Sequence, residues 1–331
     1  MKKVALFFLK LTISAGLVVW AFSRQNIHPD RLLGYLRSAH PLLLLAAVLL
    51  FVGSIGIGAL QWNLLLRTQG IRLPWRRVLS FYFVGVFFNN VLVGNVGGDA
   101  LRIYDVRRTT KDGSAAFVAT FLDRFIGLFA MTCFAIVAYI GMPSFPQSHA
   151  VLGLILALMA ALLGLILLVL SRRLSRVAEK AVRKVLPVRI GDMISRIRAG
   201  MLHCRSNLRQ LWAVPGIALG VQFLRILVHY VTGRSLGVDI SLGYFLIFIP
   251  LIAVVASVPI SLGGIGVREN FGVLLFGRVG MPGSMAFSME FLAYLVGLAA
   301  SLVGGLLFLF RGFRNQEPRV RNKEPGVRSK E

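Results

Sequence analysis

Two short polar stretches interrupt the long apolar runs of this chain and carry its candidate chemistry. Residues 89–102 read NNVLVGNVGGDALR and follow an apolar run, and residues 259–269 read PISLGGIGVRE. A Gly-rich break at membrane depth leaves backbone N–H and C=O groups without helical partners, which is tolerated only inside protein or beside a wet cavity. Each stretch also holds an arginine, Arg102 or Arg268. Guanidinium is a planar, permanently charged partner for phosphate, so we expect a site for a phosphate-bearing group.

The two breaks correspond to each other along the chain. Each contains a glycine pair followed one helical turn later by an arginine: Gly97-Gly98 with Arg102, and Gly263-Gly264 with Arg268. Broken apolar segments in corresponding positions of two halves are a sequence pointer to a transporter site. We therefore expect an inverted repeat, with halves at about 41–140 and 212–310. Chance similarity of Gly-rich membrane segments is the alternative.

Composition makes this an all-α polytopic membrane protein. The 331 residues are 56% apolar and 15% charged, whereas soluble domains carry about 25% charged residues. The net charge of +24 resides mainly in loops beside apolar runs, the pattern of positive-inside topology and anionic-lipid contact. No DNA- or RNA-reading motif accompanies it, which excludes nucleic acid as a partner. We expect no disulfide between the two cysteines, which lie in dissimilar segments.

Hydropathy predicts six full spans and two re-entrant hairpins in one transmembrane domain, residues 1–310. The spans are predicted at about 4–22, 41–66, 115–140, 151–170, 212–232 and 285–310. If the first Gly-rich segment crossed fully, the basic loop at Arg107, Arg108 and Lys111 would lie outside, so a hairpin entering from the cytoplasm fits the charge rule better. Eight full spans remain an alternative. Gln61, Trp62 and Asn63 are interpreted as polar or interfacial residues near a span end.

Two basic segments lie outside the predicted spans. Residues 171–209 predict an amphipathic helix in the membrane interface, with a solvated connector helix as an equal alternative. Residues 311–331 form a basic tail that we expect to be disordered. Both termini are predicted to be cytoplasmic.

The acidic residues near the breaks admit two roles. They could carry protons in coupled transport or neutralise the arginines, and neutralisation is favoured for the acids. For Arg102 and Arg268 themselves the favoured role is contact with a lipid phosphate, aided by free N–H groups at the helix N-termini beside the breaks. The alternative is that Arg102 pairs with Asp99, and Arg268 with Glu269, as structural latches.

The same motifs resemble the flippase-like transmembrane family that includes the membrane region of lysylphosphatidylglycerol synthases. The resemblance covers about residues 4–310 and rests on Asn89-Asn90 leading into Gly97-Gly98-Asp99 with Arg102, on Asp123-Arg124, and on Pro259 leading into Gly263-Gly264-Ile265-Gly266-Val267-Arg268-Glu269. It implies an inner-membrane protein that moves a lipid between leaflets. The synthases also carry a soluble aminoacyl-transferase domain, which this sequence lacks after its last predicted span, so we expect no lysyl transfer.

The favoured function is therefore flippase-like transport of an anionic phospholipid or lipid-linked intermediate. An integral-membrane transferase with Asp99 or Glu269 as base, or a scaffold for a partner synthase or glycosyltransferase, is the alternative. An enzymatic role is less favoured, because no nucleotide or metal motif occurs, and no cofactor is expected. The candidate substrate-binding residues are Asn89, Asn90, Asn95, Gly97, Gly98, Asp99, Arg102, Asp123, Arg124, Pro259, Gly263, Gly264, Gly266, Arg268, Glu269 and Glu290.

Overall fold

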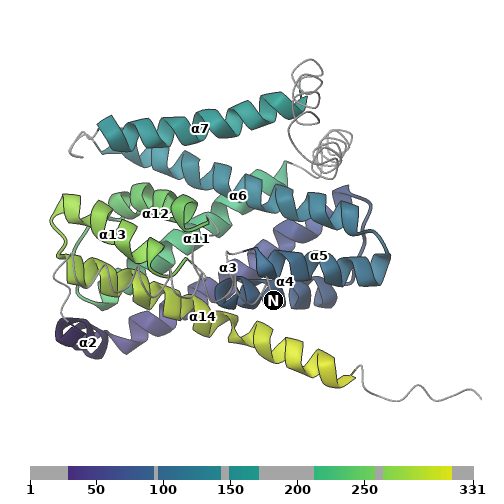
Figure 1. Ribbon diagram of the computed structural model, residues 1–331, viewed down its shortest axis with the longest axis horizontal. Helices are drawn as coiled ribbons and strands as arrows, with labels where there is room; N and C mark the ends of the chain where they lie inside the picture. Colours follow the sequence, from purple (N-terminus) through teal and green to yellow (C-terminus); the bar gives the residue numbers. More distant parts are fainter. Residues whose placement is uncertain (1–28, 93–95, 143–148, 171–211, 258–263, 315–331) are drawn as a thin grey trace, which may run out of the picture.

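The computed structural model describes residues 29–92, 96–142, 149–170, 212–257 and 264–314. These residues form helices and no strand (Figure 1). The elements are α2 (Pro29–Ser38), α3 (Pro41–Thr68), α4 (Trp75–Val91), α5 (Gly97–Thr110), α6 (Gly113–Gly141), α7 (His149–Leu170), α11 (Ala213–Ser235), α12 (Leu242–Ser257), α13 (Val267–Phe276), η2 (Gly277–Val279) and α14 (Gly283–Arg314).

Five helices in the described part of the chain are long and apolar enough to cross a membrane: α3, α6, α7, α11 and α14. They coincide with five of the six predicted spans, and the protein is a multi-pass, all-helical membrane protein. The span predicted at residues 4–22 and the basic helix predicted at 171–209 lie outside the described residues. α14 continues to Arg314, and the rest of the predicted tail lies outside the described residues.

Local sequence signals fix several helix ends. Proline at the first position of α3 needs no hydrogen bond from its nitrogen. The side chain of Asp112 caps α6 by accepting a 2.9 Å hydrogen bond from the backbone nitrogen of Ala115. Between them, α5 ends at Lys111, whose left-handed backbone (φ 62°) turns the chain sharply into α6. These short turns hold α4, α5 and α6 in one packed layer.

The Gly-rich stretch before α5 breaks the helix, as predicted, and α5 packs back along α4. A Cβ added at Gly98 would overlap the carbonyl oxygen of Gly85, and one at Gly85 would lie 2.5 Å from Cγ of Arg102. Gly98, at the start of α5, also lies against Asn89 near the end of α4, whereas Arg102, further along α5, lies against Gly85, earlier on α4, so the two helices are antiparallel. The glycines are required here because no side chain fits between the backbones.

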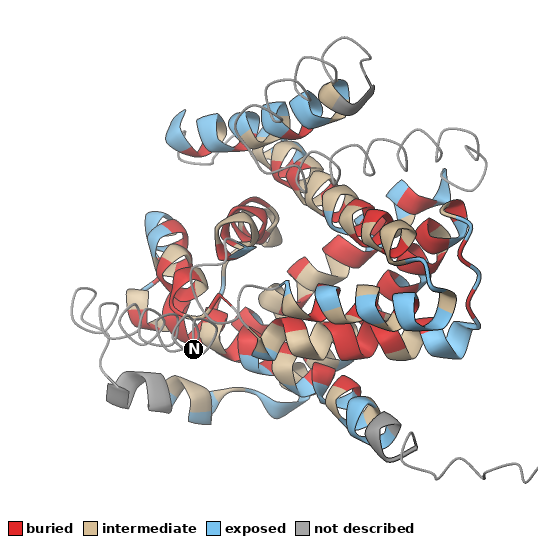
Figure 2. Cartoon of the chain, turned by 45° about the vertical axis from the view of Figure 1, so that its right-hand side comes forward, coloured by how far each residue is buried: buried red, intermediate tan, exposed pale blue. Residues whose placement is uncertain are grey.

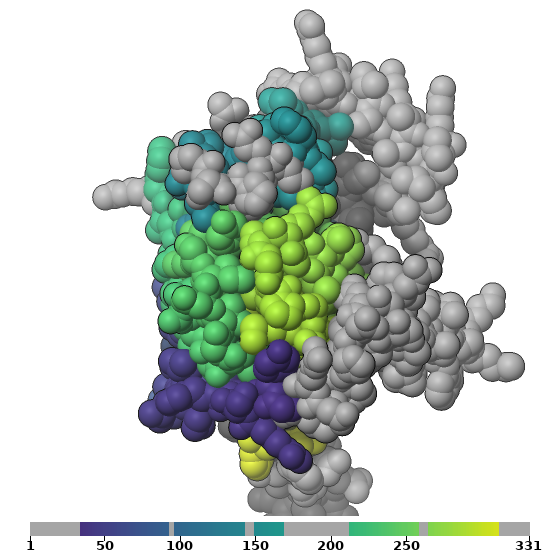
Figure 3. Space-filling view, turned by 90° about the vertical axis from the view of Figure 1, so that its left-hand side faces the viewer, coloured from purple at the N-terminus to yellow at the C-terminus, as the bar shows by residue number. Residues whose placement is uncertain are grey.

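The second break separates α12 from α13, which also pack against each other. In Figure 1 the outer ends of α4 and α5 lie on the right, while α12 and α13 lie on the left beside α2. Figure 3 looks at that left side, where the surfaces of the green and yellow-green segments adjoin. The two helix pairs therefore lie at opposite ends of the bundle (Figure 1).

The first and second halves of the bundle are interleaved. The backbone nitrogen of His40, at the start of α3, donates to Ser235 at the end of α11 (2.8 Å), and Leu65 shares a hydrophobic cluster with Val214 at the other end of that pair. α3 and α11 are thus antiparallel along their length. α14 packs on α4, and α12 on α6. Figure 2 shows the buried residues on the facing sides of these helices, with α7 largely exposed.

Candidate functional site

A cavity of about 350 Å³ lies where helices of both halves meet. This is within the size range of small-ligand sites. Its polar lining comes mainly from both predicted motifs and from three spans, α3, α6 and α11, and apolar side chains complete the lining. The lining residues are Phe51, Gln61, Tyr82, Val86, Asn89, Asn90, Arg102, Asp123, Arg124, Gly127, Leu128, Met131, Val221, Gln222, Arg225, His229, Ile249, Ile252, Ala253, Ala256, Ser257 and Arg268.

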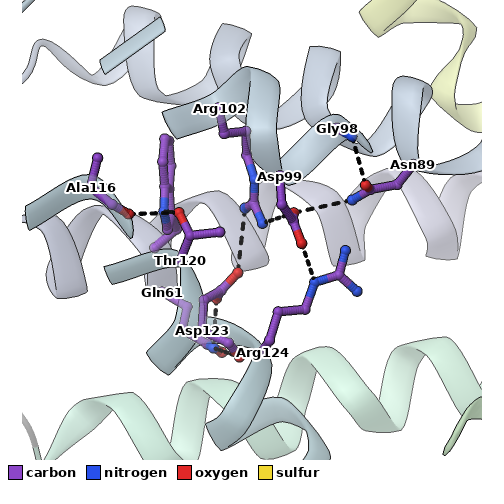
Figure 4. Close-up of polar contacts among 10 residues, drawn as sticks. Gln61, Asn89, Gly98, Asp99, Arg102, Ala116, Thr120, Asp123 and Arg124 are labelled. Carbon is purple, nitrogen blue, oxygen red and sulfur yellow. Dashed lines mark hydrogen bonds and ion pairs between the residues drawn. The ribbon is translucent and has the colours of Figure 1, made fainter. Parts of the chain in front are cut away.

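Arg102 is held inside the protein by two carboxylates and two aromatic rings (Figure 4). Its guanidinium lies 2.5 Å from Asp99 and 3.4 Å from Asp123, and its side chain is only 3% exposed. The same group lies over the rings of Tyr82 and Trp62, 4.6 and 5.1 Å from their centroids. Cation–π contacts of this kind contribute about 2 kcal/mol or more when desolvated. Of its two predicted roles, the geometry favours the latch.

Arg124 is placed differently, although it also pairs with Asp99. Its Nε lies 2.8 Å from the second oxygen of that carboxylate, yet its side chain is 46% exposed and lines the cavity. Asp99 thus joins a buried arginine on its own helix to an accessible arginine on α6. The Asp99 contact therefore positions the guanidinium of Arg124 while the side chain remains partly exposed.

Asp123 and Asn89 complete the network around Arg102. The amide nitrogen of Gln61 donates to Asp123 (2.8 Å), which ties α3 to α6. Asn89 donates to Asp99 (3.2 Å) and accepts from the backbone nitrogen of Gly98 (2.9 Å), as Figure 4 shows. Asn89 therefore satisfies backbone at the break and orients Asp99, and it also lines the cavity.

The second break places Arg268 at the cavity and Glu269 in the protein interior. Glu269 is 1% exposed, and one of its oxygens accepts from the backbone nitrogen of Gly266 (2.6 Å), capping α13. Gly266 adopts φ 83°, a conformation that favours glycine. The guanidinium of Arg268 lies 5.3 Å from the ring centroid of Tyr294 on α14. The capped N-terminus of α13 thus carries an arginine that faces the cavity.

Tyr294 connects this arginine to the other break. Its hydroxyl donates to the carbonyl oxygen of Asn90 at the end of α4 (3.1 Å). The amide of Asn90 in turn donates to Ser301 (3.1 Å) and to the carbonyl of Gly297 (3.3 Å) on α14. Asn90 therefore satisfies backbone and side-chain groups between the halves, while still lining the cavity.

Glu290 is buried completely in α14 and faces a histidine. Its Oε1 lies 3.3 Å from Nδ1 of His229, and its Oε2 has no hydrogen-bond partner among the described residues. Unlike Glu290, His229 lines the cavity. One helical turn away, Arg225 also lines it, and its Nε has no hydrogen-bond partner in the described part of the chain.

The structure brings most of the predicted site residues together. Six of them line the cavity: Asn89, Asn90, Arg102, Asp123, Arg124 and Arg268. Asp99, Glu269 and Glu290 contact the cavity lining or its supporting backbone, and Gly97, Gly98, Gly264 and Gly266 form the starts of α5 and α13. Asn95, Pro259 and Gly263 lie outside the described residues.

The sequence did not reveal the two aromatic rings that contact Arg102, those of Tyr82 and Trp62. Trp62, interpreted as interfacial, is fully buried and donates to Thr120 (3.1 Å). Tyr82 lies in a uniformly apolar run that gives no signal of its role. Gln61 and Gln222, which precede the two breaks at similar spacing, both line the cavity; that spacing was the available signal. No cluster of three metal-ligating side chains occurs among the described residues.

Comparison with known proteins agrees with this architecture. The model of the lysylphosphatidylglycerol synthase transmembrane region matches residues 7–305. A UPF0104 membrane protein of Pyrococcus horikoshii is 24% identical over 334 aligned residues, covering 93% of this chain and 97% of that protein. A UPF0104 membrane protein of Methanothermobacter thermautotrophicus is 22% identical over 295 residues, covering 83% and 87%. The chain therefore belongs to the lysylphosphatidylglycerol synthase transmembrane-region family.

Proposed function

We propose that this protein moves an anionic lipid between the leaflets of the inner membrane, passing the headgroup through the cavity while the acyl chains remain in lipid. The observation that carries the proposal is the meeting of arginines from both halves, Arg124, Arg225 and Arg268, at one cavity. Guanidinium groups bind phosphate oxygens through charge-assisted hydrogen bonds. Ionisable groups at membrane depth mark functional sites by default.

Charge balance supports phosphate contact by these three arginines more than by Arg102. Arg102 is matched by Asp99 and Asp123 at close range and is almost fully buried. Arg124 contacts Asp99 through its Nε, and its side chain is 46% exposed. An anionic headgroup would bind such an accessible guanidinium at the cavity, whereas a zwitterionic headgroup would bring its own cation to the arginines.

The remaining cavity wall suits the glycerol and upper acyl region of a lipid. Phe51, Leu128, Met131, Ile249 and Ile252 line it together with the polar groups. Burying apolar lipid surface against these side chains is favourable, at about 25 cal/mol per Å². A cavity lined by both charged and apolar side chains accommodates both parts of a lipid.

We further propose that α4–α5 and α12–α13 are re-entrant hairpins of an inverted repeat. The order span, hairpin, span occurs twice, as α3, α4–α5, α6 and as α11, α12–α13, α14. None of the four hairpin helices reaches the roughly 20 residues needed to cross the hydrocarbon core. The outer ends of α4 and α5 carry Arg76, Arg77, Arg107 and Arg108, which makes that end cytoplasmic. On this topology both termini are cytoplasmic.

The alternatives receive less support from the site. Asp99, a candidate base for a transferase, already binds two arginines, and Glu269 caps α13. The basic helix proposed to hold a partner synthase lies outside the described residues. Transport is therefore the function that the geometry favours.

The test is leaflet exchange of fluorescent phosphatidylglycerol in proteoliposomes. We expect Arg124→Gln, Arg225→Gln and Arg268→Gln each to slow exchange by about tenfold, corresponding to loss of one charge-assisted contact of about 1.4 kcal/mol. Arg108→Gln, at an exposed position on α5 away from the cavity, is the matched control. Full activity in all three cavity variants would overturn the site, and a chemically altered lipid found by mass spectrometry would favour a transferase.

A further inference from the structure

The buried carboxylates of the two spans α6 and α14, Asp123 and Glu290, have different partners. Asp123 on α6 accepts hydrogen bonds from Arg102 and from Gln61 on α3. Glu290 on α14 faces His229 on α11, with no arginine in ion-pair range among the described residues. One carboxylate therefore pairs with a guanidinium, and the other faces an imidazole, a side chain that can both accept and donate a proton.

We propose that Glu290 and His229 form a proton-binding site that couples proton movement to movement of the lipid. This inference rests on the proposed transport function and names its energy source. The imidazole of His229 lines the cavity, so water entering there can reach it, while Glu290 lies behind it at 0% exposure. A proton taken up by one ring nitrogen is released from Nδ1 to Oε1 of Glu290, 3.3 Å away.

Glu290 has few polar contacts for a buried carboxyl. An ionised carboxylate buried with only one hydrogen-bond contact is costly, because desolvation is not offset. Its Oε2 lacks a partner within the described residues, so the contact of Oε1 with His229 is the polar contact that the structure gives this side chain. The proposed role of Glu290 therefore depends on its small number of hydrogen bonds. Both carboxylate oxygens of Asp123 accept hydrogen bonds, so Asp123 is less suited to such a role.

Other charged groups near this pair come from the helices that pack on α14. α13 contributes Arg268 and Glu269, and α11 contributes Arg225 beside His229. The remaining neighbours, α3, α4 and α2, carry ionisable residues elsewhere along their lengths: Arg67 on α3; Arg76, Arg77 and Tyr82 on α4; and Asp30, Arg31, Tyr35 and Arg37 on α2. Protonation of Glu290 therefore changes the charge balance mainly against Arg268 and Glu269.

Packing links this change to the cavity. A Cβ added at Gly272 would lie 2.6 Å from Cγ of Glu290, so the backbone of α13 rests directly on the Glu290 side chain. Gly272 lies one helical turn after Arg268, the cavity arginine of the same helix. Neutralising Glu290 weakens its attraction for the α13 arginine and its repulsion of Glu269. The position of Arg268 at the cavity then depends on the proton.

The experiment applies a pH gradient to proteoliposomes whose membrane potential is clamped, and follows fluorescent phosphatidylglycerol in each leaflet. With one proton per lipid, a gradient of about one pH unit shifts the leaflet ratio by up to about tenfold. We expect wild type to show this shift, and Glu290→Gln and His229→Gln to lose it at whatever rate they exchange lipid. Asp239→Asn, which neutralises a carboxylate that is 93% exposed, is the control and should behave as wild type.

Three outcomes separate coupling from transport and from a structural role. Exchange by wild type that ignores the gradient overturns the coupling and leaves the transport proposal intact. Variants that lose thermal stability but keep the gradient response show a merely structural contact. Infrared spectroscopy of purified protein is independent of transport: we expect a pH-dependent carboxyl C=O band that Glu290→Gln removes, and its absence overturns the proton site even if no lipid is exchanged.

Discussion

The side-chain oxygen of Asn89 accepts a 2.9 Å hydrogen bond from the backbone nitrogen of Gly98, which joins the two sides of the first helix break. Asn89 is 7% exposed, and its amide nitrogen also donates to Asp99. One side chain thus satisfies a backbone group that the break deprives of a helical partner and orients the carboxylate that pairs with two arginines. The helix break is therefore stabilised by the same side chain that positions the charged residues of the site.

Replacing Asn89 by alanine should therefore destabilise the protein. It leaves the Gly98 nitrogen and one side of Asp99 without partners, at a cost of about 1–3 kcal/mol. Thermal unfolding in detergent, followed by tryptophan fluorescence, measures the effect. Val91→Ala, at a side chain that is 45% exposed, should leave the melting temperature nearly unchanged.

Gly98→Ala should prevent the first hairpin from closing. The added methyl overlaps the Gly85 carbonyl oxygen, which is backbone and cannot rotate away. We expect a large loss of folded, monodisperse protein in size-exclusion chromatography. Gly53→Ala adds the same methyl in α3, where it meets nothing within 4 Å, and should be neutral. Equal yields of the two variants would contradict the close approach of α4 and α5.

Arg102→Gln should unfold the site more than it alters lipid contact. It leaves Asp99 and Asp123 without their shared partner, and breaking a buried ion pair in this way costs about 3–5 kcal/mol. Adding Asp123→Asn removes one of the uncompensated charges and should restore part of the melting temperature. A double mutant as unstable as the sum of its single mutants would exclude the direct pairing.

Cysteine accessibility tests the hairpin topology. With Cys133 and Cys204 replaced, Arg76→Cys and Thr109→Cys should react with an impermeant maleimide from one face of the membrane, and Ser241→Cys and Arg278→Cys from the opposite face. That result follows from the opposite entry of the two hairpins. Labelling of positions 76 and 109 from different faces would instead show eight full spans.

The spans and the breaks could be predicted from sequence because each depends on local composition. Hydropathy placed α3, α6, α7, α11 and α14, and paired glycines placed the starts of α5 and α13. Apolar runs and glycine pairs leave a mark that needs no knowledge of neighbours in space. The same information could not specify which helix each break would contact.

The partners inside the site could not be predicted in this way. Asp123 contacts Arg102 and Gln61, and Arg124 contacts Asp99, although Asp123 and Arg124 are neighbours in the sequence. These contacts depend on how α3, α5 and α6 cross, which no local pattern encodes. Adjacent residues on a helix also point in different directions, so sequence neighbours rarely pair.

The interleaving of the halves makes the chain one cooperative unit. α14 packs so closely on α4 that a Cβ at Gly304 would overlap the carbonyl oxygen of Phe83, and α12 packs on α6. A proteolytic cut between α7 and α11 would thus yield two fragments, and helices of each fragment would pack against helices of the other. The fragments should stay associated until both melt together, in a single transition.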